Sequence, residues 1–430
     1  MKPSIPKGTR DFGPEEVRKR QYLFAIIREA FVRFGYEPVE TPSLENLETL
    51  TGKYGEEGDK LLFKVLTHVA GEEGPTAKRG LRYDLTVPFA RFVVMHQHQL
   101  RFPFKRYQIQ PVWRADRPQK GRYQEFFQCD ADVVGSPSLM YEAELVSLFD
   151  QVFTHLGIPV RIEVNHRMLL AGMAVVAGLE DQFTSMTTAV DKWDKIGPEG
   201  VAADMERRGI SPAKAAHLLE ILQHNDLEYF RDLLADSPIG TSGIEEMDVF
   251  LRYLAITPTR NPVVFTPLLA RGLGYYTGCI FEVKPEGEGM GSIGGGGRYA
   301  DLTGIFGMQG MPGVGISFGA ERIYDIMEAR QLFPSDLTGT LKILFAALDS
   351  EAHHYAFGAL QQVRNAGIPA DLYPEPDKLK KPLKYAADRR IPFVAIAGEA
   401  ELALGHFMLK DMTKGTQESL PLAEIIQRLS

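Results

Sequence analysis

Apolar residues near the start of the chain recur with helical spacing and then give way to an extended segment. Pro14 suits the first position of a helix, and Glu15 and Glu16 suit the positive end of the helix dipole. The apolar residues that follow would share one helix face: Leu23, Ile27, Ala30, Phe31 and Phe34. Gly35 marks the end of this helix. The segment from Tyr36 through Pro42 then predicts a strand, and its proline indicates a sheet edge or an interface.

Two apolar-rich runs further along the chain are separated by a long charged loop. Phe104–Trp113 and Phe126–Val134 predict strands, with the sequence RADRPQKGRYQE between them. This order indicates a hairpin with a long basic tip, and such tips usually carry function. Strands are also predicted within residues 262–283 and over 313–318, and the glycine tract Gly294–Gly297 lies between these two regions. A helix is predicted to begin at residues 319–322.

The length of 430 residues exceeds what one hydrophobic core usually supports, so we expect more than one domain. Residues from about 166 to 258 have a mostly helical pattern with mixed charges, which indicates a helical insertion. Turn-forming residues at 331–340 indicate a linker. Beyond it strands and helices alternate, which predicts a compact α/β domain with parallel strands over residues 341–430. Residues 1–330 would then form the first domain, interrupted by the insertion.

The composition narrows the class of protein without fixing its function. Hydrophobic residues make up 44% of the chain and charged residues 24%, as in ordinary globular proteins. The net charge of −8 counts mildly against a nucleic-acid binder, although a local basic face can still bind phosphates. The two cysteines, Cys129 and Cys279, are far apart, which excludes a disulfide framework and predicts no zinc site. Without an apolar run of about 18 residues or a signal-peptide core, we expect a cytoplasmic protein that does not enter membranes.

The familiar nucleotide-binding motifs are missing, and isolated arginines stand in their place. The sequence has no GxxxxGK[ST] loop and no strand-linked GxGxxG. Four arginines instead lie among acids and aromatic residues at predicted loop and strand ends: Arg114, Arg122, Arg271 and Arg322. Guanidinium groups presented from rigid strands suit a triphosphate, because they bind phosphate oxygens in pairs and stay charged. Taken singly, each arginine is equally consistent with a surface salt bridge.

Several sequence blocks together resemble one family, the histidyl-tRNA synthetases of class II. The blocks are LRYDLTVPFAR (81–91), RADRPQKGRYQEFFQCDADVVG (114–135), ARGLGYYTGCIFEV (270–283) and GGGRYADL (295–302). PKGTRDF (6–12) resembles the start of that family, and the run from PLKYAADRR to HFMLKDM resembles its anticodon-binding domain. The first helix, Arg114 and Arg322 resemble the three class II motifs. The resemblance spans nearly the whole chain and is weakest in the helical insertion.

The resemblance implies a fold, a reaction and partners. The fold would be an α+β catalytic domain with a mainly antiparallel sheet, the helical insertion, and a C-terminal α/β anticodon-binding domain. The reaction would join histidine to the 3′ end of tRNA(His), with ATP as a substrate and histidyl-adenylate as the intermediate. Mg²⁺ is expected with the ATP, but its ligands are unknown. The first helix and the strand ending at Pro42 would form a homodimer interface.

The resemblance also implies the residues that bind histidine. This set comprises Asp84, Leu85, Thr86, Gln128, Asp132, Tyr275, Tyr276 and Tyr299. Asp84, Thr86 and Gln128 would hold the α-amino group, and Asp132 would face the imidazole. Because alternate side chains of a strand share one face, Gln128, Asp130 and Asp132 can all point into one pocket.

A second implied set would bind ATP and the tRNA. Arg114 and Arg271 would flank the α-phosphate as the catalytic residues, while Arg122 and Arg322 hold the triphosphate. Phe126 would stack on adenine, with Asp116 near its edge. The hairpin tip would contact the acceptor end of the tRNA through Arg117, Gln119 and Lys120, although a solvated charged loop explains these three residues as well.

The sequence departs from the family pattern at three places, and three other functions would place different demands on it. Gly274 and Asp132 stand where the family usually has aspartate and glutamate, and Ala300–Asp301 replaces Asp-Gly. The glycine at 274 affects only the contacts that would hold Arg271 in place. A regulatory paralogue of the fold would lose the catalytic arginines, the RGLxYY block and the anticodon domain. An adenylate-forming ligase without RNA would have no use for the C-terminal domain, and an RNA-binding protein would not need the histidine-pocket residues.

Overall fold

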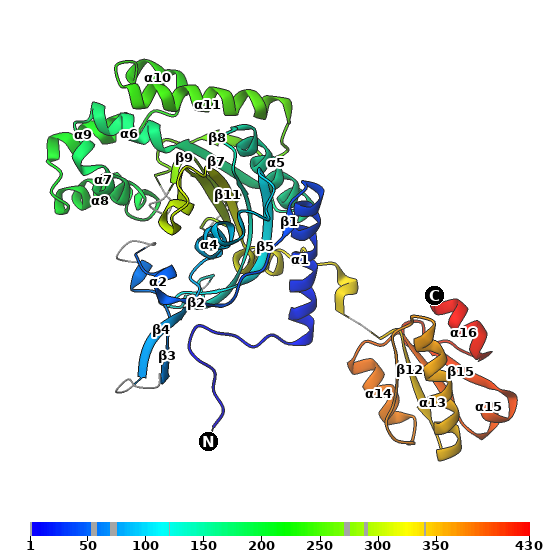
Figure 1. Cartoon of the computed structure of the whole chain (residues 1–430). Helices are drawn as coiled ribbons and strands as arrows, with labels where there is room; N and C mark the ends of the chain where they lie inside the picture. Colours follow the sequence, from blue (N-terminus) through cyan, green and yellow to red (C-terminus); the bar gives the residue numbers. More distant parts are fainter. Residues whose placement is uncertain are drawn as a thin grey trace. The chain divides into compact units, whose positions relative to one another are not determined.

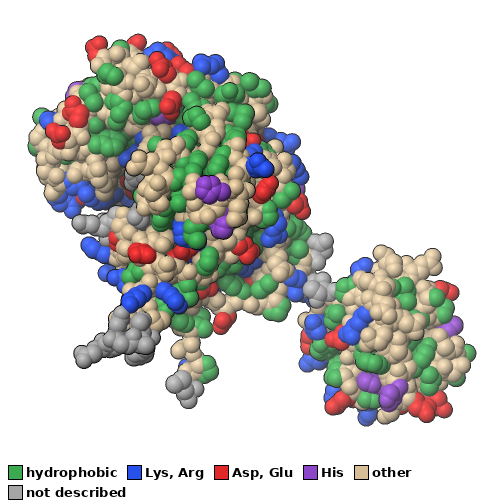
Figure 2. All heavy atoms as spheres, in the orientation of Figure 1, with side chains coloured by type: hydrophobic (Ala, Val, Ile, Leu, Met, Phe, Trp, Pro, Cys, Tyr) green, Lys and Arg blue, Asp and Glu red, His purple; other side chains and the backbone are tan. Residues whose placement is uncertain are grey.

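The computed structural model describes residues 2–52, 58–68, 75–119, 121–270, 276–287, 291–338 and 341–430. The chain divides into two compact units. The first contains residues 1–12 and 20–332, and the second contains residues 13–19 and 333–430. Among the described residues, no helix is long and apolar enough to cross a membrane. Figure 2 shows basic and acidic side chains interspersed on the visible face of both units.

The first unit is organised around a mainly antiparallel sheet (Figure 1). In the described part of the chain this sheet has eight strands in the order β1-β5-β6-β11-β10-β9-β7-β8. The pairs β1–β5 and β7–β8 are parallel, and the other five pairs are antiparallel. The strands are β1 (Glu37–Pro38), β5 (Phe104–Trp113), β6 (Glu125–Val134), β7 (Val160–His166), β8 (Val263–Phe265), β9 (Tyr276–Pro285), β10 (Gly294–Tyr299) and β11 (Gly313–Gly319).

Helices cover one face of this sheet with aromatic side chains. They are α1 (Pro14–Arg33), α5 (Met140–His155) and α12 (Ala320–Ala329). Phe318 of β11 is fully buried between Phe31 of α1 and Phe149 of α5, with ring centroids 5.9 and 4.9 Å away. Tyr107 of β5 stacks on Phe31 at 5.3 Å. These contacts hold the central strands in place on the helix-covered face of the sheet. The other face of the same strands can therefore carry polar groups.

The opposite face of the sheet carries α4 (Thr86–His96) at one end and the candidate site beside it. Phe89 and Val93 of α4 pack with Val134 and Tyr299 of the sheet. A small antiparallel sheet precedes α4 in the order β2-β4-β3, with the short helix α2. The elements are β2 (Leu44–Asn46), α2 (Leu47–Leu50), β3 (Lys64–His68) and β4 (Pro75–Leu81). The short 3-10 helices are Glu180–Gln182, Leu302–Phe306 and Ser335–Thr338.

The helical insertion lies between β7 and β8. Its helices are α6 (Arg167–Val176), α7 (Phe183–Val190), α8 (Trp193–Arg207), α9 (Pro212–Ile221), α10 (Leu227–Leu233) and α11 (Pro238–Ile256). Gly172 and Gly240 allow α6 and α11 to cross closely, since a Cβ on Gly172 would lie 2.8 Å from the Cα of Gly240. The predicted helical character of this region is confirmed.

The second unit holds a sheet in the order β13-β12-β14-β15-β16. Its elements are β12 (Ile343–Ala347), α13 (Ser350–Asn365), β13 (Ala370–Leu372), α14 (Lys380–Asp388), β14 (Phe393–Ala397), α15 (Glu399–Leu404), β15 (His406–Asp411), β16 (Gln417–Pro421) and α16 (Leu422–Leu429). Alternate residues of β12 enter two separate cores: Ile343 and Phe345 pack with α13 and α16, whereas Leu344 packs with α14. The sheet is therefore buried on both faces, as expected for an α/β domain.

Two expectations about local structure were wrong, and the glycine tract, for which no element was predicted, forms a strand. The strand expected through Pro42 is reduced to Glu37–Pro38, because proline cannot donate a ladder hydrogen bond. The glycine tract forms the strand β10, which pairs on both sides with β9 and β11. The C-terminal strands are not all parallel, since β15 runs antiparallel to β14 and β16. Residues 398–405, which join β14 to β15, are too few for a parallel crossover. The expected fold class as a whole is confirmed.

Candidate active site

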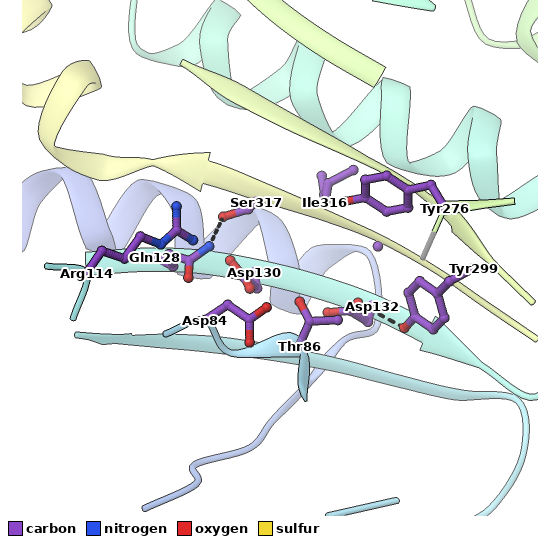
Figure 3. Close-up of a pocket in the computed structure, with 11 residues that line it drawn as sticks. Asp84, Thr86, Arg114, Gln128, Asp130, Asp132, Tyr276, Tyr299, Ile316 and Ser317 are labelled. Atoms are coloured by element: carbon purple, nitrogen blue, oxygen red, sulfur yellow. Dashed lines mark hydrogen bonds between the residues drawn. The ribbon is translucent and has the colours of Figure 1, made fainter. Parts of the chain in front are cut away.

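A polar pocket opens on the face of the main sheet that α4 leaves uncovered (Figure 3). Its lining comes from β6, β9, β10, β11, the start of α4 and the residue that follows β5. The lining residues are Asp84, Thr86, Arg114, Gln128, Asp130, Asp132, Tyr276, Tyr299, Gly315, Ile316 and Ser317. Six of the residues expected to bind histidine are among them, and so is Arg114 of the ATP set. The structure thus brings together residues as far apart in sequence as Asp84 and Ser317.

Cross-strand pairs of polar residues form the floor of this pocket. In the register of β5 and β6, Arg106 lies opposite Asp132, Gln108 opposite Asp130, and Gln110 opposite Gln128. Because a strand exposes alternate residues on one face, all six side chains belong to the pocket side of the sheet. Arg106, Gln108, Asp130 and Asp132 are all buried. A polar ladder of this kind inside an apolar sheet indicates a binding site rather than a core.

Asp132 is held from two sides at the inner end of the ladder. Its Oδ2 lies 2.8 Å from Nη2 of Arg106, and its Oδ1 accepts a hydrogen bond of 3.0 Å from the Tyr299 hydroxyl. Burial raises the pKa of Asp132, while the Arg106 guanidinium and the Tyr299 hydroxyl act in the opposite direction. Gly315 of β11 leaves the space for this carboxylate, since a Cβ there would overlap it.

Asp130 is a second buried carboxyl group on the same floor. Burial raises the pKa of Asp130 to about 7, opposed by Arg106 and reinforced by the negative charges of Asp132 and Asp84. The neighbouring Gln128 donates a hydrogen bond of 3.1 Å to the Ser317 hydroxyl. The pocket therefore holds three acids close together, which favours a cationic or hydrogen-bond-donating ligand.

Asp84 and Thr86 enter the pocket from the turn that begins α4. One oxygen of Asp84 accepts a hydrogen bond of 3.1 Å from the backbone N–H of Val87, which fixes the carboxylate at the helix N-terminus. Leu85 lies between these two residues but does not line the pocket, because its side chain is fully buried. Its backbone carbonyl accepts a hydrogen bond of 3.4 Å from Arg106.

Arg114 lies at the open end of the pocket, where β5 passes into the hairpin loop (Figure 3). Its Nε donates to the carbonyl of Tyr83 at 3.1 Å. The guanidinium lies 4.3 Å from the ring centre of Tyr83 and 5.1 Å from that of Phe126. A cation and an aromatic face are thus available next to the polar pocket, as binding of a nucleotide phosphate and base requires.

The rest of the expected ATP set lies along the hairpin loop. Arg122 forms an ion pair of 3.2 Å with Asp116. Arg322, at the start of α12, donates to the carbonyl of Gly121 at 3.1 Å and to that of Ser292 at 2.5 Å. The structure therefore brings Arg122 and Arg322 together at the hairpin loop. Neither residue lines the pocket itself.

With this geometry established, comparison with known proteins decides the family. A family model described as "Histidyl-tRNA synthetase" matches residues 8–323, and one described as "Anticodon binding domain" matches residues 342–430. The chain belongs to the histidyl-tRNA synthetase family. This confirms the family expected from the sequence blocks.

Proteins similar along their whole length support this membership. A "Histidine--tRNA ligase" of Phocaeicola vulgatus is 48% identical, over 99% of this chain and 98% of that protein. One of Bacteroides fragilis is 47% identical over 100% and 99%. The solved histidyl-tRNA synthetase of Nostoc sp. is 29% identical with a TM-score of 0.82, over 100% of this chain and 99% of that chain. A Staphylococcus aureus enzyme, 19% identical with a TM-score of 0.71, shows the likeness of fold alone.

Some expected residues of this synthetase fall outside what the structure describes or outside the pocket. Arg271, Tyr275 and Lys120 lie outside the described residues, as does the unusual Gly274. Arg117 and Gln119 are exposed at the hairpin tip. The backbone of Gln119 pairs with that of Arg122 at 2.9 and 3.0 Å.

Sequence reasoning missed two groups of residues in this synthetase. Arg106, Gln108 and Gln110 alternate with Tyr107, Ile109 and Pro111, and this two-residue period inside a predicted strand was the available signal for the ladder. The second group is an N-terminal brace. Arg10 pairs with Glu321 and lies 3.4 Å from the ring centre of Tyr123, while the N–H of Gln124 donates to the carbonyl of Gly8 at 2.8 Å. Nothing in the local pattern of PKGTRDF predicts these distant contacts.

Proposed function

We propose that this protein activates histidine with ATP and then transfers the histidyl group to the 3′ end of tRNA(His). The observation that carries the proposal is a buried floor of acids and amides on β6 with Arg114 at its open end. Such a floor can pair the nitrogen groups of histidine, and Arg114 lies where its carboxylate would meet a phosphate. Relatives of matching length named Histidine--tRNA ligase support the same reading.

Each end of the amino acid is proposed to have its own partners. Asp84, Thr86 and Gln128 would bind the α-ammonium group, and Asp132 would accept a hydrogen bond from the imidazole. The aromatic wall would come from Tyr275, Tyr276 and Tyr299, and Leu85 would support the turn from behind. Histidine donates from both ends, which fits a pocket that carries three carboxylates.

Activation needs charge stabilisation rather than a general base. The histidine carboxylate, already ionised at neutral pH, attacks the α-phosphorus of ATP, a new P–O bond forms, and pyrophosphate leaves. Arg114 and Arg271 would stabilise the charge on the α-phosphate. Arg122 and Arg322 would bind the outer phosphates, with Phe126 stacked on adenine and Asp116 at its edge.

Transfer would use the second unit and the hairpin tip. A ribose hydroxyl of the tRNA attacks the carbonyl carbon of the adenylate, an ester forms, and AMP leaves. We propose that Arg117, Gln119 and Lys120 contact the acceptor end, and that residues 341–430 recognise the anticodon. The match of residues 342–430 to an anticodon-binding domain supports the second assignment.

Mg²⁺ is proposed to arrive with ATP. Among the described residues, no group of three or more His, Cys, Asp or Glu could hold a metal ion.

Three further features remain proposals. The chain would form a homodimer through α1 and the segment around Pro42, and exposed Val32 and Leu44 near these elements support an interface there.

The domain limits would be 1–330 for the first domain, with the insertion at 166–258, then a linker at 331–340 and a second domain at 341–430. We also expect a cytoplasmic location.

Pyrophosphate exchange tests the proposed function. The purified protein is expected to exchange pyrophosphate into ATP with histidine and to reject apolar analogues by about 10⁴-fold, because they would leave the acids unpaired. Charging of tRNA(His) with labelled histidine tests the second step. Equal exchange with an unrelated amino acid, or no exchange with histidine, would refute the proposal.

A further inference from the structure

We infer that Arg106 is a positioning residue for histidine recognition, which holds the Asp132 carboxylate in place so that it can accept the imidazole N–H. The inference rests on the proposed function, because it concerns the same pocket. It adds a residue of β5, a strand that lies outside the sequence blocks that resemble the family.

The first support is the geometry of the pair. Arg106 and Asp132 are direct neighbours across two antiparallel strands, and both side chains are buried, with exposures of 0% and 3%. One carboxylate oxygen lies 2.8 Å from Arg106 and the other accepts the Tyr299 hydroxyl at 3.0 Å. Two fixed neighbours prevent the carboxylate from rotating, so its remaining lone pairs have fixed directions in the pocket.

The second support is that Arg106 is poorly explained by stability alone. Besides its pair with Asp132 it makes one long hydrogen bond, 3.4 Å, to the Leu85 carbonyl, and its guanidinium lies 4.3 Å from the ring centre of Phe89. Its Nε and Nη1 have no hydrogen-bond partner among the described residues. Arg82, equally buried, instead donates to the carbonyls of Pro111 and Thr41 and to Gln110. A buried ion pair with unsatisfied donors is often less stabilising than apolar packing of the same volume.

The third support is the charge of the surroundings. The other ionisable groups that line the same pocket are Asp130 on β6, Asp84 before α4, Arg114 just after β5, and the two phenols Tyr276 and Tyr299. At the inner end of the pocket, Arg106 is the cation that directly opposes the acids. Burial raises the pKa of Asp132, and Arg106 counteracts this. Without Arg106, Asp132 would become protonated more readily and would lose acceptor capacity at one oxygen.

Replacing the cation tests this inference through the pH profile of histidine binding. Arg106→Leu and Arg106→Lys are assayed by histidine-dependent pyrophosphate exchange from about pH 6 to about pH 9, because burial raises the pKa of Asp132 and Arg106 opposes that shift. Arg106→Leu should raise the KM for histidine by about 10- to 100-fold near neutral pH, with smaller changes in kcat and in the KM for ATP. The KM should fall again toward high pH as Asp132 ionises. Arg106→Lys should lie between the wild type and Arg106→Leu.

A double-mutant cycle tests whether Arg106 acts through Asp132. In an Asp132→Asn background, Arg106→Leu should cause no further increase in the KM for histidine. Thienylalanine, whose ring has no N–H, serves as an inhibitor probe. Its inhibition constant should change by less than about 2-fold in Arg106→Leu, since the lost contact is to a ring N–H.

A matched control is Arg298→Leu, which breaks another buried pair on the sheet, with Glu142, outside the pocket lining. It should lower the melting temperature but keep the wild-type pH profile of the KM. A folded Arg106→Leu with the wild-type profile, or with equal losses for histidine and thienylalanine, would overturn the inference. If Arg106→Leu does not fold, an Arg106→Lys variant with an unchanged KM for histidine would overturn it as well. Absence of histidine exchange in the wild type would instead refute the proposed function.

Discussion

Arg20 of α1 and Glu321 of α12 form a buried, two-pronged ion pair, although 301 residues separate them. The two nitrogens of Arg20 donate to the two carboxylate oxygens at 2.6 and 2.9 Å. The backbone N–H of Phe127 also donates to Glu321, at 3.3 Å. One carboxylate thus connects the first helix, the hairpin strand and the helix that carries Arg322.

Removing Arg20 should therefore destabilise the protein strongly. Arg20→Ala leaves the buried Glu321 with less compensation, and loss of one member of a buried pair costs about 3–5 kcal/mol. Chemical denaturation measures the loss. The control Arg207→Ala removes an arginine whose side chain is 73% exposed and paired with Asp204, and should cost less than about 1 kcal/mol. Equal losses for the two variants would show that Arg20 contributes no more than a surface pair.

The narrow space around Gly315 gives a prediction about substrate binding. Gly315→Ala would place a methyl group on the Asp132 carboxylate and displace it, so the KM for histidine should rise by about 10-fold or more. Gly358→Ala is the matched control, because it lies in α13 with no neighbouring atom within 4 Å. It should leave exchange unchanged and stabilise α13 by up to about 1 kcal/mol. An unchanged KM in Gly315→Ala would mean that Asp132 does not contact histidine.

The raised pKa of Asp130 predicts an unusual pH dependence of stability. Its pKa is about 7 in the folded protein against an ordinary value of 3.8. Between these values the folded state holds a proton that the unfolded state has released, so this residue makes stability fall as pH rises through the window. Asp130→Asn removes the effect, and its melting temperature should exceed that of the wild type by a few degrees at about pH 8 but by much less at about pH 4.

Asp204 provides a control of opposite sign for this measurement. Hydrogen bonds from Lys192 and Arg208 lower the pKa of Asp204 to about 2. Its ionised form stabilises the protein at neutral pH, and that stabilisation is lost as pH falls below the ordinary value of 3.8. Asp204→Asn should therefore lower the melting temperature at neutral pH. A gain from Asp130→Asn that does not vary with pH would contradict the assignment for Asp130.

Arg271 is expected to contribute to the chemical step. Arg271→Ala should slow adenylate formation by about 10²- to 10³-fold, as loss of one transition-state donor does. The effect on kcat should exceed that on the KM for histidine, and thermal stability should change little. Arg117→Ala, at the exposed hairpin tip, serves as the control and should keep the wild-type rate of exchange. A folded Arg271→Ala variant with wild-type exchange would remove Arg271 from the catalytic residues.

Removal of the C-terminal domain should separate the two steps of the reaction. A chain that ends at Ser335 is expected to fold and to keep histidine-dependent exchange, since linkers mark domain boundaries. It should lose most charging of tRNA, and adding the isolated domain in trans should restore little. Undiminished charging by the shortened chain would show that residues 341–430 do not recognise the tRNA.

The sequence predicted the elements whose pattern is local. The first helix begins at Pro14 as expected, and the hairpin strands agree with β5 and β6 to within one residue. Alternation along one strand also predicted that Gln128, Asp130 and Asp132 share a pocket, and the structure confirms this arrangement. Each of these features depends on the spacing of residues within a single segment.

Features that depend on a distant partner were not predictable in the same way. Arg106 faces the pocket only because β5 pairs with β6 in one particular register. The tract Gly294–Gly297 has no side chains to reveal a strand, and it becomes one because β9 and β11 lie on either side. The contact between Arg10 and Glu321 joins the beginning and the end of the sequence of the first unit. A single sequence shows none of these pairings.

The glycines of β10 and β11 also limit how this pocket could be redesigned. Engineers usually enlarge a binding site by shortening the side chains of its wall. At Gly296, Gly313 and Gly315 nothing is left to shorten, and any added atom would overlap backbone or the side chains of Tyr299 and Asp132. A larger substrate must therefore be accommodated at the neighbouring strands, so libraries aimed at new amino acids should vary the ladder residues of β5 and β6.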